Sequence, residues 1–299
     1  MQSTRASAAT CFGPDGKLRT VAANVPRIDY DPVTGSCLGL LLEEARTNLW
    51  LNSATAAAAQ SFTVTAQTYA LSFEGGGTLV LTGAYAGSSS TAVLRGGRKH
   101  LVFTPSAGTL TCTPAGDVKN VQLEAGSFST SYIPTEGSAA TRAAYAATLQ
   151  LPAELSKAGA VVCSFRHYNG SITDTTILCI DDGTETQNSQ HAIRTSNGGM
   201  TIRYTPRGSG VTIMDIGIAV ADLGAKTNVG FRFGGGNFSG ALGGVLAGPV
   251  ASDKLVPDVK RLRLGQRGSV NAVRMTGYIE RIAIYTGPIT DAQLQRLTA

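Results

Sequence analysis

The chain has 299 residues and a formal net charge of +5, and only 15% of its residues are charged, against roughly 25% in an average soluble protein. Its length predicts one large or two ordinary domains. The 36 glycines and the alternating, threonine-rich runs favour short strands joined by tight turns, and they exclude a mostly helical enzyme scaffold.

The first 53 residues are expected to form an extended N-terminal arm. Turn and extended-chain signals recur between residues 24 and 35, and residues 43–46 can add one helical turn. A segment this irregular leaves backbone groups to be satisfied elsewhere, so we expect the arm to lie on its own domain, on a sister chain or on another protein. Trp50, the only tryptophan, is interpreted as a packing anchor rather than a ligand platform.

Residues 54–133 are expected to form a small antiparallel β-sandwich. The apolar pattern changes here to period two, with no helical pattern between the alternating runs. Six or seven strands in about 80 residues are typical of such a sandwich. The runs that we predict as strands are 62–65, 69–73, 78–81, 101–104, 109–113 and 118–124. Small polar residues with Pro and Gly over 134–148 predict a linker.

Residues 149–299 are expected to form a larger sandwich, a two-sheet jelly roll. The predicted strands are 160–166, 176–180, 191–195, 200–204, 211–220, 228–233, 241–246, 261–264 and 277–285. Thr290 and Gln293 match a capping box, which opens a short C-terminal helix whose Leu294 and Leu297 share one face. The predicted fold is thus all-β, with two antiparallel β-sandwiches, and a cut in the linker should release a folded fragment that begins near Leu149.

The five cysteines predict a chain that folds in a reducing compartment. Their number is odd and no Cys-x-x-Cys spacing occurs. Cys112, Cys163 and Cys179 stand in apolar strand patterns, where a free thiol behaves as a small hydrophobic group. The first ten residues lack an apolar core, so no signal peptide is expected. No apolar run approaches 18 residues, so no membrane insertion is expected.

Two separated strings resemble segments of structural and tail-associated proteins of tailed bacteriophages. The first, within 27–49, contains R-I-D-Y-D-P-V-T-G and G-L-L-L-E-E-A-R-T-N-L, and the second, within 121–135, contains V-Q-L-E-A-G and T-S-Y-I-P-T. Residues 54–120 between them resemble the carbohydrate-binding-module-like sandwiches of those proteins. The resemblance implies a virion protein that is synthesised and assembled in the cytoplasm of a host bacterium.

The C-terminal half is similar to concanavalin A-like, laminin-G-like jelly rolls. The similarity lies in L-R-L-G at 262–265, in G-Y-I-E-R-I-A-I-Y at 277–285 and in the T-D-A-Q-L ending at 290–294. It implies the jelly-roll fold and leaves the ligand open.

Catalytic patterns are missing from the sequence, and we expect no enzyme activity. A glycosidase needs two carboxylates that face one sugar ring, yet Glu154, Glu185 and Glu280 stand alone after the linker. No Gly-x-Ser-x-Gly motif accompanies the histidines. His167 ends a predicted strand and His191 begins one, so both are expected at the surface.

Two neighbouring loops hold the residues that we predict as ligand-binding. Asp181 and Asp182 belong to the string D-D-G-T-E at a strand end, where carboxylates suit Ca²⁺; the alternative is a solvated Asp-Gly turn, and whether a metal binds is left open. Tyr168 and Asn169, in the preceding loop, supply an aromatic ring and an amide, which suit a sugar. No cofactor other than this Ca²⁺ is expected.

One basic run alternates with leucine along a predicted strand. It comprises Lys260, Arg261, Arg263 and Arg267, and period two places its arginines outward. We interpret it as a solvated sheet face rather than a nucleic-acid stripe, because no nucleic-acid-binding motif accompanies it. Nucleic acid is therefore not an expected partner.

Three functions from different classes remain open. The first is a virion fibre or appendage that displays a lectin-like domain for attachment to host-surface polysaccharide. The second is a head-decoration or fibre protein with no ligand, and the third is a glycan-degrading enzyme. Other virion proteins are expected partners. The apolar residues of the arm predict self-association, and the phage resemblance favours a trimer.

Overall fold

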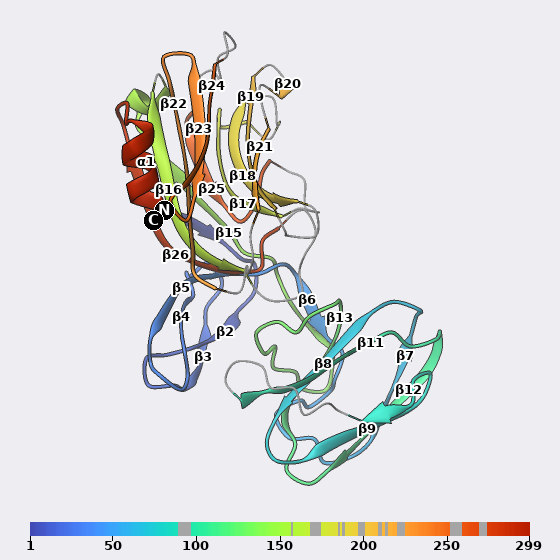
Figure 1. Cartoon of the computed structure of the whole chain (residues 1–299). Coiled ribbons are helices and arrows are strands. Elements are labelled where there is room, and N and C mark those ends of the chain that lie inside the picture. Colours follow the sequence, from blue (N-terminus) through green and yellow to red (C-terminus); the bar gives the residue numbers. More distant parts are fainter. Residues whose placement is uncertain are drawn as a thin grey trace. The chain divides into compact units, whose positions relative to one another are not determined.

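The structure is a computed structural model that describes residues 1–88, 97–156, 158–167, 175–184, 186, 189–196, 201–208, 211–212, 215–219, 225–251, 259–268 and 274–299. Its strands pair antiparallel in several sheets, and one short helix stands near the C-terminus (Figure 1). The predicted all-β fold class is confirmed. No helix of the described residues is long and apolar enough to cross a membrane.

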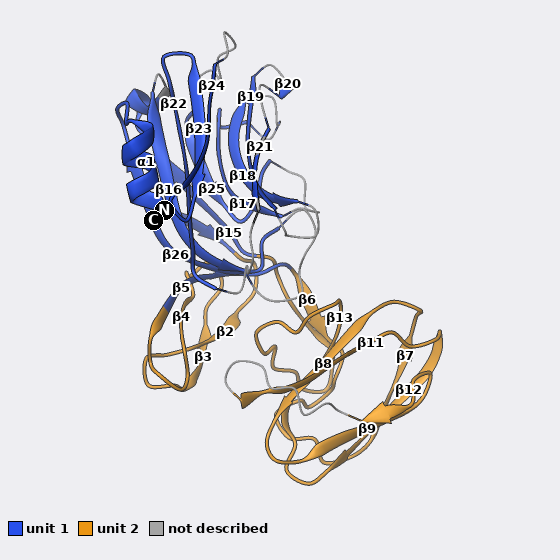
Figure 2. Ribbon diagram, viewed as in Figure 1, with its two compact units in different colours: residues 1–4, 38–44, 145–299 blue, residues 5–37, 45–144 orange. Residues whose placement is uncertain are grey.

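The chain divides into two compact units that do not follow chain order (Figure 2). Unit 1 comprises residues 1–4, 38–44 and 145–299, and unit 2 comprises residues 5–37 and 45–144. The chain crosses from unit 2 to unit 1 for the last time between residues 144 and 145, which lie within the predicted linker 134–148. The predicted divisions at 53, 133 and 148 differ from these boundaries, because short early segments pair with strands far along the chain.

Unit 1 is a sandwich of two antiparallel sheets. The first sheet has the order β1 (Gln2–Thr4), β15 (Ala146–Gln150), β25 (Arg261–Leu264), β17 (Thr176–Asp181), β18 (Gln190–Ser196), β19 (Thr201–Gly208) and β20 (Val211–Thr212), with β21 (Ile216–Ala219) also on β19. The second sheet contains β24 (Val245–Ala251), β23 (Asn237–Leu242), β22 (Thr227–Gly234), β16 (Gly159–His167), β26 (Gly277–Tyr285) and β5 (Cys37–Leu42).

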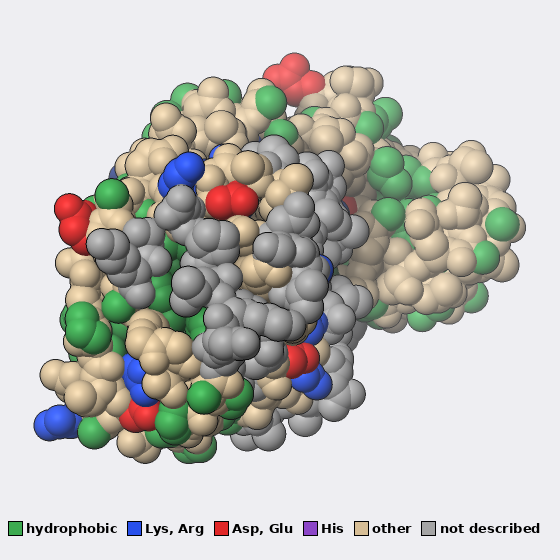
Figure 3. All heavy atoms as spheres, turned by 90° about the horizontal axis from the view of Figure 1, so that it is seen from above, with side chains coloured by type: hydrophobic (Ala, Val, Ile, Leu, Met, Phe, Trp, Pro, Cys, Tyr) green, Lys and Arg blue, Asp and Glu red, His purple; other side chains and the backbone are tan. Residues whose placement is uncertain are grey.

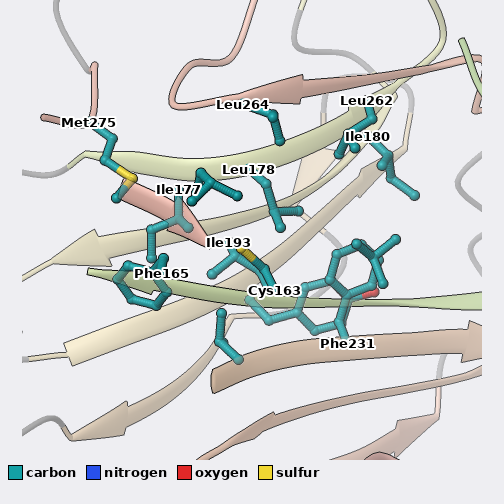
Figure 4. Packing of buried hydrophobic residues seen from close by; sticks show 14 of the residues in the cluster. Cys163, Phe165, Ile177, Leu178, Ile180, Ile193, Phe231, Leu262, Leu264 and Met275 are labelled. Atoms are coloured by element: carbon teal, nitrogen blue, oxygen red, sulfur yellow. The ribbon is translucent and has the colours of Figure 1, made fainter. Parts of the chain in front are cut away.

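The core of unit 1 lies between these two sheets. Leucines and isoleucines of the first sheet, among them Leu178, Ile180 and Leu264, are buried in one cluster with Cys163 and Phe231 of the second sheet (Figure 4). Burying one large aliphatic or aromatic side chain stabilises a fold by about 1.5–3 kcal/mol. Every second side chain of these strands points into the core, so the side chains between them lie on the outward face of the first sheet.

Helix α1 (Asp291–Thr298) packs on the outer face of the second sheet. Thr290 accepts a hydrogen bond from the backbone of Gln293, whose side chain bonds back to Thr290. Leu294 is buried against Val162 and Ala241. The predicted capping box and docking face are confirmed. A short 3₁₀ helix, Ala153–Ser156, precedes β16.

Some predicted elements differ from those observed. The predicted strand 241–246 spans a hairpin, because Gly243 and Gly244 adopt positive φ between β23 and β24. The helical turn predicted at 43–46 is wrong, since β6 (Arg46–Asn48) is extended and pairs with β14 (Ala140–Arg142).

Unit 2 contains the predicted small sandwich. One sheet has the order β10 (Gly87–Ser88), β9 (Thr78–Gly83), β12 (Gly108–Ala115), β7 (Gln60–Val64), and the other β11 (Lys99–Phe103), β8 (Tyr69–Glu74), β13 (Lys119–Ala125). Unit 2 also contains the hairpin β2 (Ala9–Phe12)–β3 (Leu18–Val21) and the strand β4 (Ile28–Tyr30). Trp50 is fully buried in the sandwich core, as its interpretation as a packing anchor requires.

Buried hydrogen bonds join parts of the two phage-like strings inside unit 2. The Asn48 amide donates to the carbonyls of Val121 and Ile133, and it accepts from the backbone of Leu123. The Glu124 carboxylate accepts from the backbone and hydroxyl of Thr130. A buried polar group without such partners would cost about 1–3 kcal/mol, so these residues of the strings have a structural role.

The first 53 residues do not form an extended arm. β1 pairs with β15, and β5 pairs with β26, so distant strands satisfy their backbone groups. Leu40, Leu42 and Trp50 are buried within the chain. The apolar side chains of this segment led us to expect self-association. Most of them are covered by this chain itself, although Ile28 and Leu51 remain partly exposed.

Candidate functional site

The outward face of the first sheet in unit 1 carries rows of mostly polar side chains, of which Asp181, Gln190 and Arg263 are buried. Direct pairing across β15, β25, β17, β18 and β19 aligns Gln150, Arg261, Asp181, Gln190 and Arg207 in one row. Side chains that are paired directly across strands lie on the same face. We call this surface, with the two parallel rows described next, the polar face.

The second row has small residues at its centre. Thr148, Arg263, Cys179, Ala192 and Thr205 are paired across the same five strands. The Cys179 thiol donates to the side-chain oxygen of Gln190 at 3.3 Å, and burial raises the pKa of that thiol.

The third row places two arginines side by side. Arg194 on β18 is paired directly with Arg203 on β19, and both approach Asp215, which precedes β21. Arg203 Nη1 lies 2.7 Å and Arg194 Nη2 lies 3.6 Å from Asp215 Oδ2. Sequence reasoning missed this group, because only the register of three strands brings its members together.

Asp181 is the centre of a buried ion-pair network. Arg263 Nε donates to one carboxylate oxygen, and Arg261 Nε donates to the other at 3.1 Å. Both arginines also donate to the Thr184 carbonyl. Arg263 is only 4% exposed, so the expectation of a solvated face is wrong for this residue. The predicted alternation is confirmed, because Leu262 and Leu264 point into the core.

The other predicted ligand residues are placed as follows. Asp182 accepts hydrogen bonds from the backbone and hydroxyl of Thr184 within an exposed turn. Tyr168 and Asn169 lie outside the described residues. Among the residues that the structure describes, no three His, Cys, Asp or Glu side chains gather as metal ligands, and the predicted ligand role of this loop stays a prediction.

Both histidines expected at the surface are buried. His191 lies in the core between the sheets, where its ring is within 4.2 Å of the Phe233 ring centroid and its Nδ1 lies 2.7 Å from the Tyr204 hydroxyl. His167 Nε2 lies 3.0 Å from the Thr175 hydroxyl. Both expectations were wrong, because a position at a strand end does not reveal what another segment places over it.

Glu280 is bound between two cations on the second sheet. Arg166 Nε lies 2.6 Å and Lys226 Nζ lies 2.8 Å from its carboxylate. Burial alone would raise the pKa of Glu280, but the hydrogen bonds from Lys226 and Arg166 hold it below its usual range. A carboxylate in this setting is ionised and does not suit the role of a general acid.

A small apolar pocket of about 10 Å³ lies between the sheets of unit 1. Its lining includes Ile193, Tyr204, Gly240 and Leu242. The pocket offers packing space rather than polar recognition. Figure 3 shows the surface from above, where the coloured Lys, Arg, Asp and Glu side chains lie singly or in small groups of opposite charge.

Comparisons with known proteins identify no family. No family model and no curated protein matches the chain. Among solved structures, the CBM40 domain of the IT-sialidase from Ruminococcus gnavus has a TM-score of 0.41 and 17% identity, over 48% of this chain and 84% of that chain. A SAP-like pentraxin from Limulus polyphemus has a TM-score of 0.40 and 13% identity, over 50% and 72%. Similarity at this level assigns no ligand.

Proposed function

We propose that the protein is a non-enzymatic structural protein of a tailed-phage virion, and that the polar face of unit 1 binds host-surface glycan. The observation that carries the binding role is the third row of the polar face, where the side chains of Arg203 and Asp215 are each 34% exposed. Arg, Asp, Gln and Thr side chains predominate in the three rows of this face, while the opposite side chains of the same strands form the core. Such donors and acceptors on a rigid sheet suit the hydroxyl groups of sugars.

The surroundings of the carboxylates support binding rather than hydrolysis. Asp181 is held by Arg261 and Arg263, and Glu280 is held by Arg166 and Lys226. A glycosidase needs one protonated carboxylic acid opposite a second carboxylate. The hydrogen bonds from Lys226 and Arg166 hold the pKa of Glu280 below its usual range, so Glu280 does not suit the role of that acid.

The virion role rests on the two phage-like strings. The structure joins parts of these strings by buried hydrogen bonds, which supports their interpretation as the framework of unit 2. Assembly in the host cytoplasm is supported by the absence of a disulfide, since all five cysteines are free. Other virion proteins and a trimeric assembly are part of this proposal, because many weak sugar sites act together through multivalency.

A glycan array probed with the full chain, together with a reducing-sugar assay on the bound glycans, separates the three functions. Binding without new reducing ends supports the proposal. Binding with release of reducing ends favours a glycan-degrading enzyme. No binding, with the protein located on the virion by electron microscopy, favours a head-decoration or fibre protein with no ligand.

A further inference from the structure

The charged residues of the polar face are mostly arginine. Along the described strands of the first sheet stand Arg194, Arg203, Arg207, Arg261 and Arg263. Asp215 contacts Arg194 and Arg203, and Asp181 contacts Arg261 and Arg263. A concentration of guanidinium groups on one face favours anionic ligands over neutral sugars.

Arg194 and Arg203 already hold a carboxylate together. Asp215 Oδ2 lies 2.7 Å from Arg203 Nη1 and 3.6 Å from Arg194 Nη2. The side chains of Arg203 and Asp215 are each 34% exposed, so solvent reaches this pair. The geometry of the two guanidinium groups therefore fits a carboxylate at a place that a ligand can approach.

Neighbouring hydroxyls orient both guanidinium groups. Arg203 Nε donates to the Ser196 hydroxyl at 2.6 Å, and Arg194 Nε donates to the Thr205 hydroxyl at 3.2 Å. With the Nε atoms bound in this way, the terminal nitrogens point toward Asp215. Planar, pre-oriented guanidinium groups are the side chains best suited to bind carboxylates, because less conformational entropy is lost on binding.

We propose that the polar face selects glycans that carry carboxylate groups, and that Arg194 and Arg203 bind one such carboxylate in competition with Asp215. This inference rests on the proposed glycan-binding function and names its ligand class. Because partly exposed charges are screened by ions, the affinity falls as the salt concentration rises.

The test uses the full chain and immobilised acidic polysaccharides, namely polygalacturonate and polysialate, each compared with its methyl-esterified form. The ester keeps the sugar and removes the charge. The expected result is binding to at least one acid form and at least about tenfold weaker binding to its ester, since a charge-assisted hydrogen bond is worth about 1.5–3 kcal/mol.

Single substitutions locate the site. Arg203→Gln is expected to weaken binding of the acidic polysaccharide about tenfold, and Arg203→Lys is expected to weaken it less, because it keeps the charge. Asp215→Asn is expected to strengthen binding, because it removes the competing carboxylate. Arg281→Gln is the matched control, since Arg281 is an exposed arginine on the other sheet of unit 1, and it should leave binding unchanged.

Each other outcome overturns the inference. Equal binding of acid and ester, unchanged in Arg203→Gln, shows a glycan-binding protein without charge selection, so the proposed function survives. Binding of duplex DNA with the same dependence on Arg203 shows a general polyanion surface. No binding of any polysaccharide, acidic or neutral, rejects the proposed function together with the inference. Circular dichroism of each variant verifies that it is folded.

Discussion

At the residue scale, the contacts of Asp181 with Arg261 and Arg263 are the most buried ion pairs of the polar face. Asp181 is 1% exposed and Arg263 is 4% exposed. Removing one partner of a buried pair leaves the other charge without compensation, which costs roughly 3–5 kcal/mol. We expect Asp181→Asn to lower the free energy of unfolding by about that amount, as measured by urea denaturation.

The matched control for this substitution is Asp182→Asn. Asp182 accepts hydrogen bonds from the Thr184 backbone and hydroxyl in an exposed turn, so its loss should cost less than about 1 kcal/mol. Equal effects of the two substitutions would show that the Asp181 network does not stabilise the sheet.

His191 makes the stability of unit 1 depend on pH. Burial lowers the pKa of His191 from 6.5 to about 3. The unfolded chain therefore takes up a proton as the pH falls below 6.5, while the folded chain does not until about pH 3. Stability is fully present above pH 6.5 and is lost in that window by up to about 1.4 kcal/mol per pH unit.

The double variant His191→Phe with Tyr204→Phe should reduce this pH dependence. It removes both partners of the hydrogen bond, so no buried hydroxyl is left unpaired. Tyr204→Phe alone keeps His191 and should keep the wild-type dependence. Urea midpoints measured at neutral pH and in mildly acidic buffer give the comparison. The same pH dependence in the double variant and in wild type would contradict this role of His191.

The sequence predicts the burial of individual residues only where local alternation of apolar and polar side chains determines it. The pattern around Leu262 and Leu264 correctly predicts which side chains enter the core. It does not predict that Arg263 is buried, because its partner Asp181 lies 82 residues earlier in the chain. His191 was misplaced for the same reason, since Phe231 and Phe233 come from another strand.

At the element scale, β23 has one glycine that leaves space in the core. A Cβ atom at Gly240 would lie 3.4 Å from Tyr204 Cβ, an ordinary contact distance, and Gly240 lines the apolar pocket. Because Ala restricts the unfolded chain, Gly240→Ala is expected to stabilise the protein by about 0.4–1 kcal/mol, measured as a rise in melting temperature.

Gly39 in β5 is the matched contrast. Its φ is +102°, and a Cβ atom there would lie 2.3 Å from the Ile279 carbonyl oxygen. Gly39→Ala should therefore lower the melting temperature. A lower melting temperature for Gly240→Ala as well would show that the pocket cannot accept a methyl group.

Elements defined by local signals were predicted well, and elements defined by pairing were not. The capping box at Thr290 and Gln293 is local and was confirmed. The turn at Gly243 and Gly244 is an exception, because Gly-Gly between apolar residues is a local hairpin signal that the prediction of one strand over 241–246 overlooked. Residues 43–46 have helix-forming side chains, but pairing of β6 with β14 keeps the adjoining chain extended.

At the scale of the whole molecule, unit 1 is assembled from three segments of the chain. β5 pairs with β26, and Leu40 and Leu42 are part of the unit 1 core. A fragment that begins at Leu149 lacks these residues. We therefore no longer expect a cut in the linker to release a stable fragment. We expect this fragment to be destabilised relative to unit 1 in the full chain, because several large side chains and a strand are missing.

Supplying residues 38–44 in the same polypeptide tests this assembly. A fragment 145–299 extended by a flexible linker and residues 38–44 should show a sharper, higher thermal transition than 149–299 by circular dichroism. Identical transitions would contradict the contribution of β5. Sequence alone could not give this arrangement, since no local pattern in 38–42 shows that its partner strand begins at Gly277.

The central claim is that the polar face of unit 1 binds glycan without cleaving it. The most direct measurement is equilibrium binding of the full chain to a panel of bacterial surface polysaccharides, with reducing ends counted in the same samples. The account predicts saturable binding that weakens in Arg203→Gln, stays unchanged in Arg281→Gln, and produces no new reducing ends. Absence of binding across the panel, or the appearance of new reducing ends, would contradict it.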